Sequence, residues 1–293
     1  IYPMENPDGR ERFLSQVETW RGKVRNSDTQ SFPHSGVWPS GRTNHYHFDL
    51  NRDWFILSQP ESRARVKLLL DWNPQLVVDA HEMGSFSSFL FNPPREPINP
   101  NINKRIINWW KIFAKDQASA FDQYGKDYYT REWLEEWYPG YGSSYPSYHG
   151  AISILYEQAR TSGIEVKQRE GTLLTFKEAI ENQFISSLAN LFTTANNKSE
   201  ILKEYFEVKK EALNSLRKDD IKYFIIENKI NKARVSKFIE TLLLQKIDIF
   251  KTDKDVIVNS VKNYRNENLS SHKFAKGSYI IPVSYTHLTL LTK

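Results

Sequence analysis

The stretch QLVVDAHEMG, residues 75–84, places a short apolar run directly before a histidine and a glutamate. A second apolar run, AISILYE at 151–157, also ends on an acid. Short apolar runs of this kind are typical of buried strands. In α/β folds the functional groups gather beyond the carboxyl ends of such strands. Both runs therefore predict strands of a buried sheet that carry chemistry at their carboxyl ends.

Helices are expected on either side of these strands in the sequence. Four segments have the apolar spacing or the turn signals of helices: residues 10–19, 60–71, 102–123 and 172–195. The segments 20–45 and 138–150 are rich in Gly, Pro, Ser or Tyr and predict long loops. This alternation favours an α/β fold with a mixed central sheet and helices on both faces.

The composition changes after residue 195. All eight tryptophans lie before this point, and the first 195 residues carry a formal charge of −2. Residues 196–276 are rich in Lys, Asn and Ile and carry a charge of +6. A strand, a helix and a strand are expected here in that order, at 222–227, 232–245 and 246–250. We therefore expect a first domain at 1–195 and a small α/β accessory domain at 196–283.

The composition also excludes several classes of site. Cysteine is absent, which rules out disulfides, thiolate zinc sites and a cysteine nucleophile. No stretch approaches the roughly 18 consecutive apolar residues of a spanning helix, so no integral membrane segment is expected. The basic region 196–276 would suit nucleic acid or anionic lipid, but acids are interspersed in it. This pattern favours a solvated helical surface, and nucleic acid is not expected as a partner.

Four short motifs in the first domain carry a family resemblance. They are NPDG at 6–9, DLNRDW at 49–54, DAHEMG at 79–84 and ILYEQA at 154–159. In their order and spacing they resemble the zinc carboxypeptidase family, the carboxypeptidase A-like metallopeptidases. The resemblance implies a zinc carboxypeptidase-like fold, zinc as the cofactor, and hydrolysis of C-terminal residues from peptides. Peptide or protein C-termini would be the substrate.

The resemblance also assigns catalytic roles to individual residues. His81 would be a zinc ligand. Glu157 would be the catalytic glutamate that takes a proton from the zinc-bound water. Arg42 is the first candidate for stabilising the oxyanion of the tetrahedral intermediate, and Arg21 is the alternative.

Substrate binding is assigned in the same way. Asn51 and Arg52 would grip the C-terminal carboxylate of the peptide through charge-assisted contacts. The mobile tyrosine that covers the substrate in the family would be Tyr138, or alternatively Tyr141, in a loop whose Gly and Pro suit a moving lid. Ser143 and Ser144 in that loop are small and neutral, which disfavours selection of a charged side chain.

One family motif is missing from the chain. Members take two of the three zinc ligands from a His-x-x-Glu motif, but none of the seven histidines here has Glu three residues later. In the family this motif lies upstream of NPDG, so we expect an N-terminally truncated bacterial member that is inactive by itself. The rival interpretation is a pseudoenzyme that binds peptides through Asn51 and Arg52. Amide cleavage of cell-wall peptides and deglutamylation are alternatives within the family.

The last residues of the chain divide into two parts. FAKGSYIIPV at 274–283 predicts a turn and a strand, and it resembles the C-terminal segment of larger bacterial members of the family. SYTHLTLLTK at 284–293 breaks this pattern, and we expect it to be a non-native tail. Because bacterial relatives are commonly exported, the resemblance implies a periplasmic or secreted location.

Overall fold

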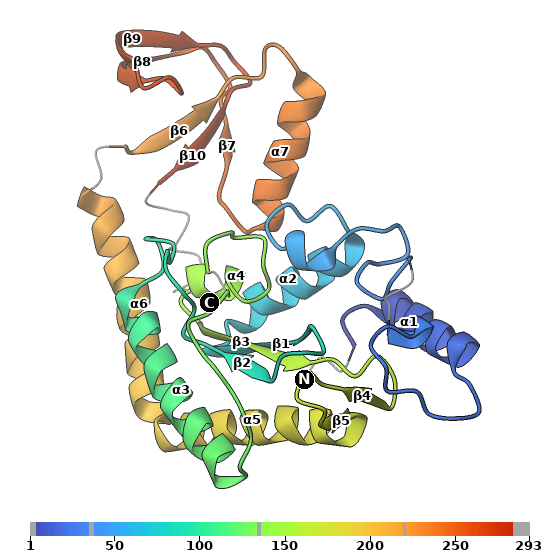
Figure 1. Cartoon of the computed structure of the whole chain (residues 1–293). Helices are drawn as coiled ribbons and strands as arrows, with labels where there is room; N and C mark the ends of the chain where they lie inside the picture. Colours follow the sequence, from blue (N-terminus) through green and yellow to red (C-terminus); the bar gives the residue numbers. More distant parts are fainter. Residues whose placement is uncertain (1–3, 35–37, 134–135, 219–220, 284–293) are drawn as a thin grey trace. The chain divides into compact units, whose positions relative to one another are not determined.

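The structure of the chain is a computed structural model (Figure 1). It describes four stretches of the chain: residues 4–34, 38–133, 136–218 and 221–283. The predicted tail at 284–293 lies outside these residues. The chain divides into two units, Ile1–Val208 and Lys209–Lys293, and the division lies inside helix α6 (Lys198–Lys218). The expected boundary after residue 195 therefore falls within the first unit.

Besides the start of α6, the helices of the first unit are α1 (Pro7–Trp20), α2 (Pro60–Trp72), α3 (Lys104–Gln123), α4 (Tyr145–Tyr148) and α5 (Phe176–Asn196). Helices α1, α3 and α5 each follow a residue whose side chain accepts a hydrogen bond from a free backbone N–H group: Asn6, Asn103 and Thr175. Two short 3₁₀ turns, η1 (Phe32–His34) and η2 (Leu50–Arg52), lie between α1 and α2. The Asn6 side chain accepts a hydrogen bond from Gly9 N at 3.0 Å, so the NPDG motif itself starts α1. The helix thus begins earlier than the sequence indicates.

The central sheet of the first unit is mixed and has the order β1-β3-β2. Its strands are β1 (Leu76–Met83), β2 (Phe89–Phe91) and β3 (Ile152–Ala159). β1 runs parallel to β3, and β2 runs antiparallel to β3. The prediction of two strands at the apolar runs is confirmed, as is the mixed α/β architecture. The expected burial holds for β3 only, because β1 lies at the edge of the sheet and is half-buried or exposed before Met83. β2 and the small hairpin of β4 (Glu165–Lys167) and β5 (Leu173–Thr175) were not predicted.

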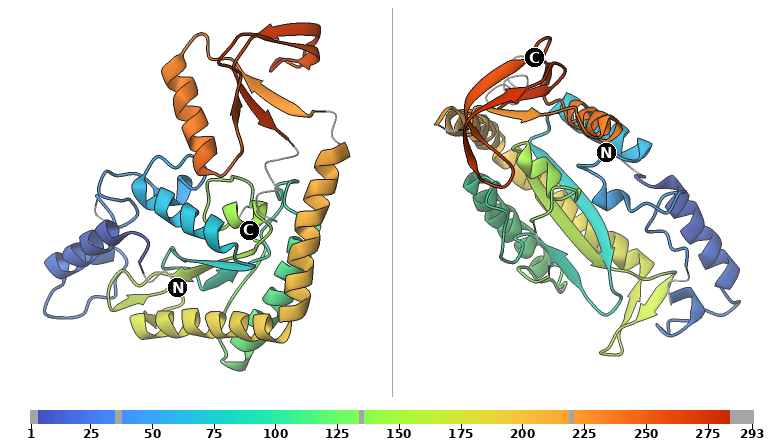
Figure 2. Two further views of the ribbon diagram at one scale, coloured as in Figure 1. Left: turned by 180° about the vertical axis from the view of Figure 1, so that it is seen from behind. Right: turned by 90° about the horizontal axis from the view of Figure 1, so that it is seen from above.

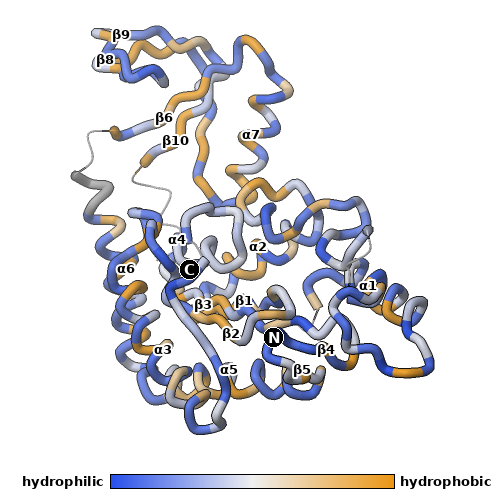
Figure 3. The backbone as a smooth tube through the Cα atoms, in the orientation of Figure 1, coloured by the Kyte–Doolittle hydropathy of each residue, from blue (hydrophilic) through white to orange (hydrophobic). Residues whose placement is uncertain are grey.

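The core of the first unit lies between the sheet and α3. Its fully buried side chains include Phe89, Trp110, Phe113, Phe121 and Tyr156. The indole Nε1 of Trp110 also donates a hydrogen bond to Ser153 O of β3 at 2.6 Å. Figure 2 shows α5 along the sheet beside α3, and Figure 3 shows the apolar colouring of the strands. This packing fixes β3, and with it the position of Glu157.

The described part of the second unit contains the end of α6, one further helix and two small antiparallel sheets. Its elements are β6 (Tyr223–Ile226), α7 (Lys232–Leu244), β7 (Phe250–Lys251), β8 (Val256–Lys262), β9 (Asn268–Phe274) and β10 (Tyr279–Pro282). One sheet has the order β6-β10-β7, and β8 pairs with β9. Among the described residues no helix is long and apolar enough to cross a lipid bilayer.

The expected strand at 246–250 is wrong for most of its length. Lys246 has a positive φ of 57°, and the N–H of Ile247 donates to Leu242 O at 3.1 Å. These residues therefore close the last turn of α7, as is common at helix ends. The strand is left with Phe250 and its neighbour, and the β8–β9 hairpin was not predicted.

Candidate functional site

The site is built where β1 and β3 approach their carboxyl ends. His81 of β1 lies opposite Glu157 of β3 in the parallel register. Asn51 of the 3₁₀ turn η2 reaches this pair from outside the sheet, and its Nδ2 lies 3.0 Å from His81 Nε2. The structure therefore brings together three of the residues that the sequence singled out.

Asn51 is held by a hydrogen-bond network. Its backbone N–H donates to Asp49 Oδ1 at 2.9 Å, and the other carboxylate oxygen of Asp49 accepts from Arg42 Nε at 3.1 Å. The backbone N–H of Gly142 donates to Asn51 Oδ1 at 2.7 Å. Asn51 thus connects the loop 138–144 to His81. Asp49 bonds to both Asn51 and Arg42, so it holds the Arg42 guanidinium close to Asn51.

Arg52 lies at the surface beside both predicted lid tyrosines. Its guanidinium carbon is 4.3 Å from the centroid of the Tyr141 ring, a cation–π contact. The Tyr138 hydroxyl donates to the backbone oxygen of Arg52 at 3.2 Å, and the two tyrosine rings meet edge to face. Arg52 Nη1 donates to Asn51 O at 2.8 Å. The guanidinium is exposed to solvent, and this hydrogen bond and the Tyr141 ring restrict its position.

Glu157 is buried, and burial raises the pKa of its carboxyl to about 7. The neighbouring charges partly cancel. His81 and Arg42 favour the ionised form of Glu157, whereas Asp79 and Glu82 oppose it. Glu157 Oε2 has no hydrogen-bond partner among the residues that the structure describes. A carboxylate that exchanges its proton near neutral pH and has a free oxygen is suited to general-base chemistry.

His81 Nε2 has two neighbours with opposite requirements. It lies 2.9 Å from Asp79 Oδ1 and 3.0 Å from Asn51 Nδ2. An ionised carboxylate accepts hydrogen bonds and an amide nitrogen donates them, so Nε2 satisfies one neighbour at a time. Burial lowers the pKa of His81, but the charge and hydrogen bond of Asp79 raise it, with a smaller contribution from Glu157, and the net shift is upward.

The described residues do not fit a catalytic zinc site. Such a site takes three protein ligands and leaves one position for water. The described part of the chain contains no group of three or more His, Asp or Glu side chains placed to hold a metal ion. His81 is a single imidazole, and Asp79 and Asn51 already occupy its Nε2.

Three residues of the site were missed by the sequence analysis. Asp79 was quoted in its motif without a role, although a residue two positions before His81 on a strand lies on the same face. Asp49 is likewise part of a quoted motif. Glu136 is fully buried and accepts a hydrogen bond from Ser144 Oγ at 2.5 Å. It thereby anchors the loop 138–144, which we call the tyrosine loop. Nothing in the local sequence distinguishes Glu136 from the exposed Glu132.

The structure also separates two candidates. Among the described interactions, Arg42 and not its alternative Arg21 acts on His81 and Glu157. Arg21 lies at the C-terminal end of α1. Arg42 remains exposed while it pairs with Asp49.

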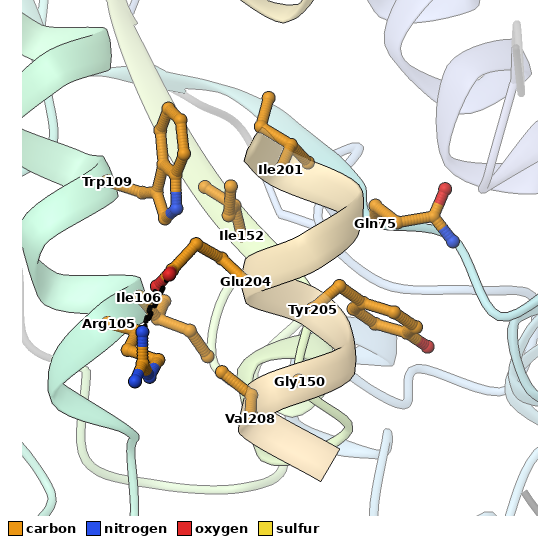
Figure 4. Close-up of a pocket in the computed structure, with 10 residues that line it drawn as sticks. All are labelled: Gln75, Arg105, Ile106, Trp109, Gly150, Ile152, Ile201, Glu204, Tyr205 and Val208. Carbon is orange, nitrogen blue, oxygen red and sulfur yellow. Dashed lines mark hydrogen bonds and ion pairs between the residues drawn. The ribbon is translucent and has the colours of Figure 1, made fainter. Parts of the chain in front are cut away.

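A hollow elsewhere in the first unit is separate from this site (Figure 4). It lies at the amino end of β3, beside Gly150 and Ile152, and Gln75 before β1 also lines it. An ion pair between Arg105 and Glu204, at 2.6 Å, forms one wall. His81 and Glu157 lie toward the other end of the same two strands, so this hollow does not belong to their site.

Comparison of the chain with protein-family models, with curated proteins and with solved structures gives no match.

Proposed function

We propose that the first unit binds the C-terminal carboxylate of peptides or proteins through Asn51 and Arg52. The observation that carries this proposal is the contact between Asn51 and His81, since it joins the surface arginine to the His81–Glu157 pair. The resemblance to zinc carboxypeptidases supports the same assignment, and it also leads us to propose a fold related to theirs and an exported location.

The chemistry of Arg52 suits this role. A guanidinium offers a planar fork of N–H donors that matches a carboxylate in a two-bonded contact. Tyr141 and Asn51 O hold the group in place, so less conformational entropy is lost when a carboxylate binds. Tyr138 and Tyr141 would cover the terminal side chain of the peptide.

A second candidate is hydrolysis of the terminal peptide bond, and Glu157 favours it. Burial raises the pKa of its carboxyl to about 7, and a general base works best with a pKa near the working pH. The carboxyl also lies opposite His81 in the sheet. In a metallocarboxypeptidase, zinc supplies a nucleophilic water and polarises the carbonyl group. Because the described residues contain no group of three His, Asp or Glu side chains placed to hold a metal ion, we propose hydrolysis only for a site completed by further ligands. Carboxylate recognition is the function proposed for this chain.

The test of carboxylate recognition is a comparison of two arginine variants by calorimetric titration with short peptides. Arg52→Ala should weaken binding by roughly 10- to 100-fold, because a charge-assisted contact contributes about 1.5–3 kcal/mol. Arg265→Ala is the matched control, since its guanidinium also lies over a tyrosine ring, at 5.5 Å, but in the second unit. Equal affinities for the two variants would contradict the proposal.

A further inference from the structure

Helix α5 presents its large apolar side chains to solvent. Its buried positions are all small or polar: Ala179, Asn182, Ser186, Ala189, Asn190 and Thr193. Six large apolar side chains are between 36% and 65% exposed instead: Phe176, Ile180, Phe184, Leu188, Leu191 and Phe192. A helix on the surface of a globular protein normally has the opposite arrangement. We call these six residues the α5 stripe.

The orientation of α5 is fixed by the polar groups on its buried face. Ser186 Oγ donates to Gln117 Oε1 of α3 at 2.6 Å, and Thr193 Oγ1 donates to Asp116 at 2.6 Å. Asn190 Nδ2 donates to the hydroxyl of Tyr156 on β3. Rotating the helix to bury the stripe would break these buried hydrogen bonds, and unsatisfied buried polar groups are costly. The stripe is therefore a stable feature of the surface.

The stripe is continuous and uncharged over most of its length. Ile180, Phe184 and Leu188 are spaced by four residues and lie on one side of the helix. Between residues 182 and 197 the sequence contains no Asp, Glu, Lys or Arg. Figure 1 shows α5 along the outside of the first unit, and Figure 3 shows apolar positions along it. A surface of this kind marks an interaction site.

We propose that the α5 stripe binds the α5 stripe of a second copy of this chain. In a two-fold dimer the same patch of both copies meets, so a charged residue at the axis would face the same charge on the other copy. The centre of the α5 stripe has no charged residue, which avoids this repulsion. Taking roughly 200 Å² for a whole large apolar side chain, the stripe offers on the order of 600 Å² per chain. Two copies would bury about 1,200 Å², which reaches the range of stable protein interfaces. The ridge of side chains spaced four residues apart on one helix can pack into the groove beside the same ridge on the other helix.

The test is sedimentation of the whole chain over a range of concentrations. The wild type should sediment as a dimer of the 34.4 kDa chain and dissociate on dilution. Phe184→Glu should weaken association at least tenfold, with an unchanged circular dichroism spectrum. Ile112→Glu is the matched control, because Ile112 is 41% exposed on α3, outside the stripe. A monomeric wild type, or equal effects of the two substitutions, would overturn the proposal.

A second measurement guards against variants that fail to fold. The chain has no cysteine, so one introduced cysteine can form a disulfide only with another copy. Leu188→Cys, on the stripe, should give a covalent dimer under mild oxidation. Lys115→Cys, on an exposed position of α3, should not. A Leu188→Cys chain that stays uncrosslinked, or that crosslinks no faster than the control, would overturn the proposal.

Discussion

The two parallel strands of the site differ in how they are covered. β3 is buried at every position, whereas β1 lies at the edge of the sheet and is half-buried or exposed at every position before Met83. The difference explains the properties of the two functional groups. Burial raises the pKa of Glu157 on β3 to about 7. The open side of β1 lets Asn51 reach His81, and Gly142 of the tyrosine loop in turn donates to Asn51.

The largest expected difference between the strands is in stability. Ile154 of β3 is fully buried and pairs in register with Val78 of β1, which is 38% exposed. Ile154→Ala should lower the free energy of unfolding by about 2–5 kcal/mol, because it leaves a cavity in the core. Val78→Ala should cost under about 1 kcal/mol. Chemical denaturation measures both, and equal costs would contradict the contrast between β3 and β1.

A buried acid behind the site should show as a pH dependence of stability. Burial raises the pKa of Glu136 from an ordinary value near 4.5 to about 7. Between these values the folded chain holds a proton that the unfolded chain releases, so this contribution to stability is complete at low pH and is lost as the pH rises toward 7. The loss is about 3 kcal/mol.

The matched measurement uses Glu136→Gln, which keeps the shape of the side chain and cannot ionise. Relative to the wild type, the variant should gain about 3 kcal/mol of stability between pH 4.5 and pH 8. Denaturation curves of both proteins at several pH values give this difference. If it does not change with pH, Glu136 is not the buried acid that the structure describes.

A smaller effect is expected where the loop packs against β1. A Cβ on Gly142 would lie 2.6 Å from Asp79 Oδ2, so Gly142→Ala should displace the loop. Overpacking of this kind costs about 1–3 kcal/mol, and peptide binding should weaken with it. Gly84→Ala is the control, because no heavy atom lies within 4 Å of a Cβ there. A tolerated Gly142→Ala with unchanged peptide affinity would refute this packing argument.

The smallest expected effect is that of metal removal. Since the described residues offer no three-ligand set, zinc should bind the chain weakly, and chelation should leave peptide affinity unchanged. Titration with zinc in the presence and absence of peptide measures this. Tight binding of one zinc ion per chain would show that His81 does have metal-ligand partners.

The elements that the sequence predicts correctly are those with a local cause. The apolar runs at 75–80 and 151–157 predict strands, and strands form at Leu76–Met83 and Ile152–Ala159. The failures have non-local causes. β2 exists because Phe89 and its neighbours pair with β3 across a long separation in sequence. Pairing of this kind leaves no periodic signal in a three-residue segment.

The candidate site was predictable to a similar extent. His81 and Glu157 lie at the strand ends where chemistry was expected, and the family resemblance singled out these two residues and Asn51. The link from Glu136 through Ser144 to the tyrosine loop is a tertiary contact, and neither residue has a local signal for it. The exposed face of α5 was hidden in the same way, because a helix with apolar residues on one side indicates amphipathicity without telling which side is covered.

The most direct test of the proposed function is the affinity of the chain for one peptide in two forms, with a free and with an amidated C-terminus. Recognition through Asn51 and Arg52 predicts that amidation weakens binding by roughly 10- to 100-fold, because it removes the charged partner of the guanidinium. Equal affinity for the two forms would contradict the central claim that this site reads a C-terminal carboxylate.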